Sequence, residues 1–98
     1  MERFSITSRN VEITEEMRAY IEKRLKKMER FSEKINKAEV IVEEQRGRFR
    51  CEFLVDVNRK FLKAESISND FFYAIDELKE KMGRQLQKYE ERLKRRKR

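Results

Sequence analysis

The stretch from Asp70 to Arg98 constrains the fold most, because its apolar residues recur with the spacing of a helix. On a helical wheel, at about 100° per residue, the apolar and aromatic residues gather on one face. They are Phe71, Ile75, Leu78, Met82, Leu86, Tyr89 and Leu93. A helix with a continuous apolar face is stable when that face is covered. The pattern therefore predicts a long helix packed on another apolar surface.

The charged residues of this helix are sorted by sign. The bases on one flank of the apolar face are Lys81, Arg84, Lys88, Arg92 and Arg95. The acids on the opposite flank are Asp76, Glu80 and Glu90. An ordered row of cations favours an anionic partner. The competing interpretation is a solvated face held by i,i+4 pairs such as Glu77 with Lys81.

A second amphipathic helix is predicted from Thr14 to about Phe31. Thr14 is a good N-cap, and acids directly after it suit the positive end of the helix dipole. Its apolar face consists of Met17, Ile21, Leu25, Met28 and Phe31. Its bases on one flank are Lys23, Arg24, Lys27 and Arg30. Arg24 is closest to the apolar face, with Tyr20 on the same side, so we expect Arg24 to reach a seam between the two helices.

Four segments alternate apolar and polar residues, as strands with one buried face do. They span residues 2–7, 38–43, 49–58 and 61–66, and the third is the clearest. Gly47 and the pair Asn58 and Arg59 mark turns between the last three. The order predicts an α+β fold, β-α-β-β-β-α, in which two helices pack on one face of a four-stranded sheet. Side by side there, the helices would turn their basic flanks toward a shared groove.

The length suits one domain with a modest core, which we assign to residues 1–94. Residues 95–98 form a basic C-terminal tail. The stretch Arg92–Arg98 holds six bases in seven residues, which suits nonspecific contact with phosphate more than an ordered site.

The charge balance points to a polyanionic partner. The 98 residues contain 26 Lys and Arg against 19 Asp and Glu, a net charge of +7. This excess favours either a nucleic acid or an anionic membrane surface.

The residues that most enzymes and metal sites need are missing. The sequence has no His, one Cys and two separated Gly, which removes the commonest general base, a zinc site and a glycine-rich phosphate loop. We therefore expect no enzyme, no cofactor, no metal and no small-molecule substrate, although a carboxylate pair assembled only by the fold stays open. Without an apolar run of membrane-spanning length or a secretory signal, and with Cys51 unpaired, we expect a cytoplasmic protein.

Four aromatic residues have two interpretations. Tyr20, Phe71, Phe72 and Tyr73 could stack on nucleic-acid bases. Aromatic residues at helical spacing more often belong to a core, so we assign them to the core.

Three parts of the chain resemble the ribosome hibernation-promoting and ribosome-associated inhibitor family, also called the sigma-54 modulation protein family. They are NVEIT at Asn10–Thr14, RLKKMER at Arg24–Arg30 and, most specifically, DFFYAIDEL at Asp70–Leu78 followed by KMGRQLQK at Lys81–Lys88. The resemblance implies the same fold, related to double-stranded RNA-binding domains. It also implies a hibernation factor that binds 16S ribosomal RNA of the small subunit, lies in the mRNA and tRNA channel, and blocks the aminoacyl and peptidyl sites.

In that family, basic residues on both helices contact ribosomal RNA. The matching positions are Arg24, Lys27, Arg30, Lys81, Arg84 and Lys88, and we add the adjoining Lys23 and Arg92. The family usually has Tyr where this chain has Phe72, so a hydrogen bond from that hydroxyl is lost or relocated. The chain resembles short members without a C-terminal dimerisation domain, and we expect a monomer off the ribosome.

Two other functions fit the same charge pattern. One is a general double-stranded RNA-binding module. The other is a protein that lies on anionic membranes through a basic amphipathic helix, which would require the long helix to leave the sheet that it covers.

Overall fold

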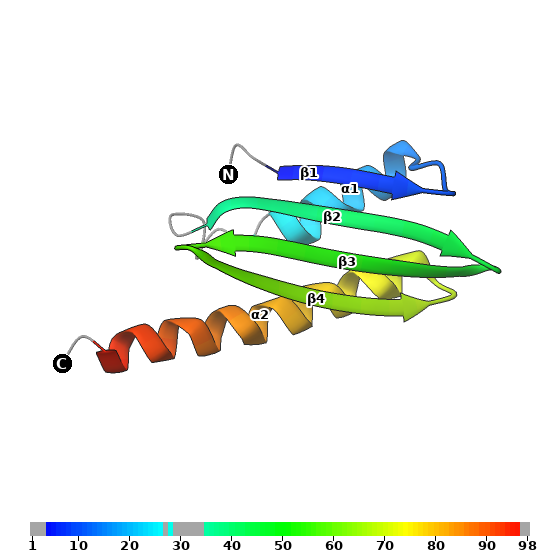
Figure 1. The fold of residues 1–98 in the computed structure, drawn as a ribbon. Coiled ribbons are helices and arrows are strands. Elements are labelled where there is room, and N and C mark those ends of the chain that lie inside the picture. The colour runs from blue at the N-terminus through cyan, green and yellow to red at the C-terminus, as the bar shows by residue number, and fades with distance from the viewer. Residues whose placement is uncertain (1–3, 27, 29–34, 97–98) are drawn as a thin grey trace.

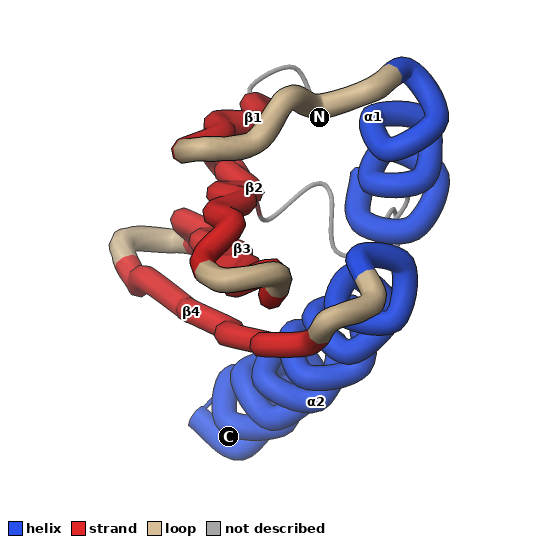
Figure 2. Tube along the Cα trace, turned by 90° about the vertical axis from the view of Figure 1, so that its right-hand side faces the viewer, coloured by secondary structure: helices blue, strands red, loops and turns tan. Residues whose placement is uncertain are grey.

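The protein has two layers, a four-stranded sheet and a pair of helices on one of its faces (Figure 1, Figure 2). The computed structural model describes residues 4–26, 28 and 35–96, with side chains as far as Arg92. The elements are β1 (Phe4–Arg9), α1 (Glu15–Ile21), a π-helical turn η1 (Glu22–Lys26), β2 (Ile35–Gln45), β3 (Arg48–Val57), β4 (Lys60–Ser68) and α2 (Phe71–Arg96). The predicted α+β fold and its element order are confirmed.

The sheet has the order β1-β2-β3-β4, with β1 parallel to β2 and the other pairs antiparallel. A parallel pair needs a crossover, and the first helix belongs to the one between β1 and β2. The antiparallel pairs need only tight turns. Arg46 and Gly47 (φ 52° and 80°) connect β2 to β3, and Asn58 and Arg59 (φ 47° and 69°) connect β3 to β4. Positive φ at both central residues matches the twist of a hairpin. The second turn has positive φ at both positions although neither residue is glycine.

The core lies between the sheet and the helices. Alternate residues of the two central strands are buried there, namely Ala38, Val40, Val42, Cys51, Phe53, Val55 and Val57. The predicted apolar face of α2 meets them with Phe71, Ile75, Leu78, Met82 and Leu86, and Tyr89 is half-buried. Ile21, Leu25 and Met28 complete the core from the first helix and the residues that follow it. Full burial of one such large side chain contributes about 1.5–3 kcal/mol, so this face is the main attachment of α2.

The opposite face of the sheet is open and carries ion pairs between β3 and β4. Arg50 donates to Glu65, and Lys63 Nζ lies 2.8 Å from Glu52 Oε2. The hydrogen bond from Arg50 lowers the pKa of the Glu65 carboxyl. Pairs on an exposed face contribute little to stability. Their effect is to keep this face polar, which leaves one face of the sheet for the helices.

Several strands extend further than their side-chain patterns predicted. Strand β1 runs on to Arg9, β2 spans Ile35 to Gln45, and β4 reaches Ser68. Pairing with β3 explains the longer β2 and β4, because backbone groups continue to pair after the apolar alternation has ended. Helix α2 continues to Arg96, beyond the predicted boundary between domain and tail.

The first helix departs from α-helical geometry after Ile21. Thr14 caps it as predicted, with its Oγ1 accepting the N–H of Met17 at 3.1 Å. From Glu22 the chain widens into the π turn η1, so a wheel drawn for an ideal α-helix misplaces side chains there. The predicted continuation to Phe31 falls on residues 27 and 29–34, which lie outside the described part of the chain.

Polar contacts at its first turn fix α2 to the end of β4. Asp70 Oδ1 accepts the N–H groups of Phe72 and Tyr73 at 3.0 and 3.4 Å, as an N-cap does. The buried hydroxyl of Ser66, in β4, donates to the backbone oxygen of Ala74 at 2.8 Å. The start of the helix is therefore held by hydrogen bonds as well as by its apolar face.

Cys51 is expected to be unreactive in the folded protein. Its burial raises the pKa of the thiol to about 12, and only the thiolate reacts with disulfide reagents. At pH 8, roughly one thiol in 10⁴ would then be ionised, even before steric exclusion. Labelling by Ellman's reagent should be undetectable in buffer and complete in urea. Equal labelling rates in the two conditions would contradict the burial of Cys51.

Candidate nucleic-acid interface

The core sets the direction of the charged side chains on both helices. Helices α1 and α2 lie side by side on one face of the sheet (Figure 2), and each turns an apolar row toward it. Ile21 and Leu25 form this row in the first helix, as Leu78 and Met82 do in the second. Residues on a helix keep fixed angles to one another, so burying one row fixes where the flanks point.

Helix α2 carries a basic strip, which we call the α2 strip. Its described members are Lys81, Arg84, Lys88 and Arg92. They are three or four residues apart, so they are neighbours on the helix surface. Lys88 and Arg92 are exposed, and the Arg84 guanidinium lies 3.9 Å from Glu80 on an exposed surface. Such an exposed pair holds Arg84 only weakly, which leaves its charge available to a phosphate.

Lys81 also fastens α2 to the sheet. Its Nζ donates to the backbone oxygen of Glu65 at 2.6 Å, and Gln85 Nε2 donates to the backbone oxygen of Lys63 at 2.6 Å. Both oxygens belong to β4, an edge strand of the sheet. This flank of α2 therefore lies along β4, and the charge of Lys81 is partly used within the protein.

The π turn η1, which continues helix α1, contributes a shorter described set of bases, which we call the α1 strip. Lys23 is exposed, and Arg24 is half-buried. Lys26, which the sequence analysis did not select, is also exposed. Lys27 and Arg30 lie outside the described residues, so their place in the site stays a prediction.

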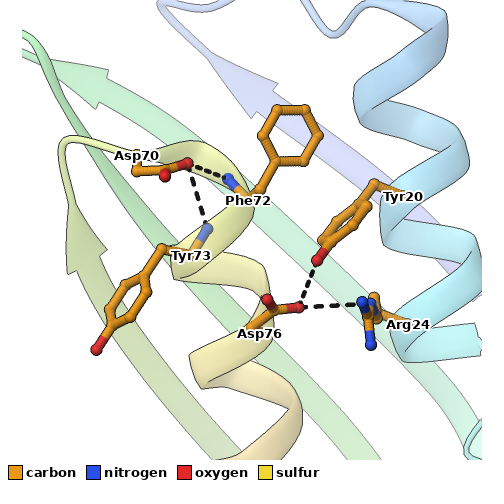
Figure 3. A network of polar contacts seen from close by, with 6 residues as sticks. All are labelled: Tyr20, Arg24, Asp70, Phe72, Tyr73 and Asp76. Carbon is orange, nitrogen blue, oxygen red and sulfur yellow. Dashed lines mark hydrogen bonds and ion pairs between the residues drawn. The ribbon is translucent and has the colours of Figure 1, made fainter.

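Tyr20, Arg24 and Asp76 meet between the two helices, at what we call the helix seam (Figure 3). The Tyr20 hydroxyl donates to Asp76 Oδ1 at 2.7 Å, and Arg24 Nε lies 3.5 Å from the same oxygen. The Arg24 guanidinium carbon is 5.1 Å from the centre of the Tyr20 ring. The hydrogen bond to Asp76, with burial second, raises the pKa of the Tyr20 phenol. The prediction that Arg24 reaches a seam beside Tyr20 is confirmed.

The expectation that both basic flanks face a shared groove is wrong. The acidic flank of α2 faces the first helix, because Asp76 meets Tyr20 and Arg24 there. Gly83 lies on the same side, where an added Cβ would be 3.9 Å from Met28 Cε. The opposite flank faces β4, so the α2 strip is separated from the α1 strip by the seam. A helical wheel places charges around one helix, but it does not show which neighbouring element each flank contacts.

One of the four aromatic residues assigned to the core lies on the surface. Phe71 is buried, and the half-buried Phe72 packs edge to face against Phe71 and Tyr20, with ring centroids 5.4 and 4.9 Å away. Tyr73 is 60% exposed, so its assignment to the core is wrong. It follows Phe72 by one residue, which turns it by about 100° away from the packed surface.

Asp76 belongs to the candidate site, although the helical pattern places it only among the acids on the flank opposite the bases. A signal was present, because Asp76 and Arg24 are opposite charges that each border the apolar face of their own helix. Their helices are far apart in sequence, and only the fold brings the two residues together.

The turn between β2 and β3 carries a second group of bases. A hollow of about 930 Å³ there is lined by Asn10, Glu44, Gln45, Arg46, Arg48, Arg50 and Ile67. Its charge is mixed, since Glu44 lines it and Arg50 is paired with Glu65. The helix layer is therefore the better candidate for an anionic ligand.

The described part of the chain contains no cluster of His, Cys, Asp and Glu suited to a metal ion.

The structural role of Lys81 can be measured against Lys88, which lies two turns further along the same strip. Lys81→Ala should lower the free energy of unfolding by about 1 kcal/mol, because it removes the hydrogen bond to Glu65. Lys88→Ala makes the same change in helix propensity and charge at an exposed position, and should stay within about 0.5 kcal/mol of the parent protein. Urea unfolding followed by circular dichroism measures both, and equal values would show that the bond does not contribute.

Comparison with known proteins reveals relatives that match nearly the whole chain. Residues 4–94 match the family described as sigma 54 modulation protein / S30EA ribosomal protein. The ribosome hibernation promoting factor of Escherichia coli K12 is 32% identical over 90 residues, which cover 92% of this chain and 95% of that protein. The ribosome hibernation promotion factor of Deinococcus radiodurans is 33% identical over 97 residues, which cover 94% of this chain. This chain spans only about half of the latter relative, 51% of its length.

Solved structures share the fold. The N-terminal domain of Thermus thermophilus Protein Y has a TM-score of 0.80 and 27% identity, covering 91% of this chain and 99% of that one. A ribosomal subunit interface protein from Coxiella burnetii has a TM-score of 0.83 over 90% of this chain and 97% of that one. At 23% identity, the second likeness shows the fold alone.

Proposed function

Because this chain belongs to the sigma 54 modulation protein / S30EA ribosomal protein family, we propose that it is a noncatalytic ribosome hibernation factor. Its ligand would be the small ribosomal subunit, through 16S ribosomal RNA. The observation that carries the proposal is the sorting of charge on the helix layer, where the α2 strip and the α1 strip present bases on either side of the seam. Relatives named as ribosome hibernation factors support it.

The proposed mechanism is occupation of a site without making or breaking a bond. Lys and Arg side chains on the two strips would contact phosphates, which position a protein on RNA and carry little sequence information. Duplex RNA is recognised mainly by its shape and backbone, so the rigid helix layer would supply the specificity. Lying in the mRNA and tRNA channel, the protein would keep ligands out of the aminoacyl and peptidyl sites. It would act as a cytoplasmic monomer off the ribosome and need no cofactor.

The separation of the two strips suggests how the RNA lies. With the carboxylate of Asp76 at the seam between them, one phosphate backbone is less suited to span both strips than two backbones are to flank the seam. Lys27 and Arg30, which we also propose as RNA contacts, lie outside the described residues. Each strip would then hold its own stretch of backbone.

The first test removes charge from the α2 strip and leaves its structural bond intact. We expect Arg84→Glu combined with Lys88→Glu to weaken cosedimentation with purified 30S subunits by at least about tenfold, because two phosphate contacts become repulsive. Lys81 is left unchanged because it holds α2 to β4. Binding of the parent protein should fall with salt, with a log–log slope of roughly 0.7–0.9 per neutralised phosphate.

The matched control makes the same change in net charge elsewhere. Arg46→Glu combined with Arg48→Glu alters the turn between β2 and β3, at the other end of the sheet from the C-terminal part of α2 (Figure 1). This variant should bind nearly as well as the parent protein. Equal losses in the two variants would mean that net charge alone acts, and unchanged binding of the Arg84 and Lys88 variant would exclude the α2 strip.

A general double-stranded RNA-binding module is the alternative, because the bases expected to contact phosphate would bind any A-form backbone. Equal affinity for an arbitrary RNA duplex and for the 30S subunit would favour it. The structure disfavours membrane binding, since α2 buries Leu78, Met82 and Leu86 in the core and would have to detach. In the described residues, no helix has both the length and the apolarity to cross a bilayer.

A further inference from the structure

We infer that Asp76 is a positioning residue that strengthens binding to RNA phosphate by orienting Arg24. The inference rests on the proposed function, because it takes RNA phosphate as the ligand. Asp76 lies between two basic strips, and its charge alone would repel that ligand. The geometry of the helix seam points to the opposite net effect.

Two contacts restrain the Arg24 guanidinium. Its Nε atom is enclosed by protein and lies 3.5 Å from Asp76 Oδ1, and its carbon lies 5.1 Å from the centre of the Tyr20 ring. A guanidinium is a planar fork with five N–H donors, one on Nε and four on the two terminal nitrogens. With Nε enclosed, the terminal nitrogens are the donors left for a ligand. The Arg24 side chain is 38% exposed, so a phosphate can approach them.

The carboxylate of Asp76 is itself held in place. It accepts the Tyr20 hydroxyl at 2.7 Å, and the Tyr20 ring packs edge to face on Phe72 at 4.9 Å (Figure 3). Arg24 is therefore fastened through Asp76 and Tyr20 to the packed surface of α2. A restrained side chain loses less conformational freedom on binding than a free one. Arg84, whose side chain is 71% exposed, has no comparable support from any described residue.

Stability alone does not account for this arrangement. The Arg24 and Asp76 side chains are 38% and 48% exposed, and pairs this accessible contribute little to folding. The closest approach uses Nε of Arg24 rather than the terminal fork, which is the part that recognises phosphate. The contact thus restrains the side chain at Nε, and the closest approach to Asp76 does not use the terminal nitrogens.

The test compares two variants that remove one negative charge from the same helix. Asp76→Asn should weaken binding to purified 30S subunits about three- to tenfold, although it makes the protein more positive. Glu80→Gln is the matched control one turn away, where the carboxylate lies 3.9 Å from exposed Arg84 and has no other ion pair among the described residues. It should bind as tightly as the parent protein or more tightly. Tighter or unchanged binding of Asp76→Asn would overturn the inference.

A second pair of variants separates positioning from a general effect on the fold. In an Arg24→Ala background, Asp76 has no guanidinium to orient and only repels phosphate. There, Asp76→Asn should leave binding unchanged or strengthen it. An equal loss with and without Arg24 would mean that Asp76 merely supports the fold, and would overturn the inference.

An observation without RNA tests the orienting contact separately from the proposed function. The Arg24 Nε–H signal in ¹⁵N NMR should show restricted motion in the parent protein and averaged motion in Asp76→Asn. The same restriction in both proteins would overturn the positioning role, even if the parent binds 30S subunits. Failure of the parent protein to bind 30S subunits, with the NMR difference present, would overturn the proposed function and leave the orienting contact established.

Discussion

The burial of one face of α2 against the sheet is the constraint on which the rest of the structure depends. Phe71, Leu78, Met82 and Leu86 are buried together with Phe53 on the facing strand. A helix held along this length cannot rotate without exposing part of that row, which would forfeit about 25 cal/mol for each Å² returned to water. Once the row is fixed, one flank of the helix must face α1, and the other must face β4.

This orientation places basic residues that look alike in sequence in three different environments. Lys81 is held by a carbonyl of β4, Arg24 is restrained at the helix seam, and Arg84 and Lys88 extend from an exposed surface. All four carry one positive charge, yet their freedom differs. An anionic ligand would meet one half-buried guanidinium and two exposed cations, so equal charges need not contribute equally to binding.

The position of Asp76 between the two helices follows from the same packing. Two helices packed side by side bring their flanks together, and like charges there would be repulsive. Asp76 on α2 accepts the hydroxyl of Tyr20 and lies 3.5 Å from Arg24 Nε, so an acid rather than a base faces the first helix. The bases of α2 are thereby left for the opposite flank and the exposed surface. The candidate site is therefore divided into two strips.

The sequence by itself determined the element order, the core faces and the identity of the charged flanks, because alternation and helical spacing are local properties. It also located Thr14 as a cap and Arg24 at a seam, since each follows from neighbours within one helix. Only the tertiary structure decided that Lys81 meets β4, that Asp76 meets Tyr20 and that Tyr73 points outward. Those outcomes depend on which element packs against each flank of a helix. The spacing of residues along one helix carries no information about that element.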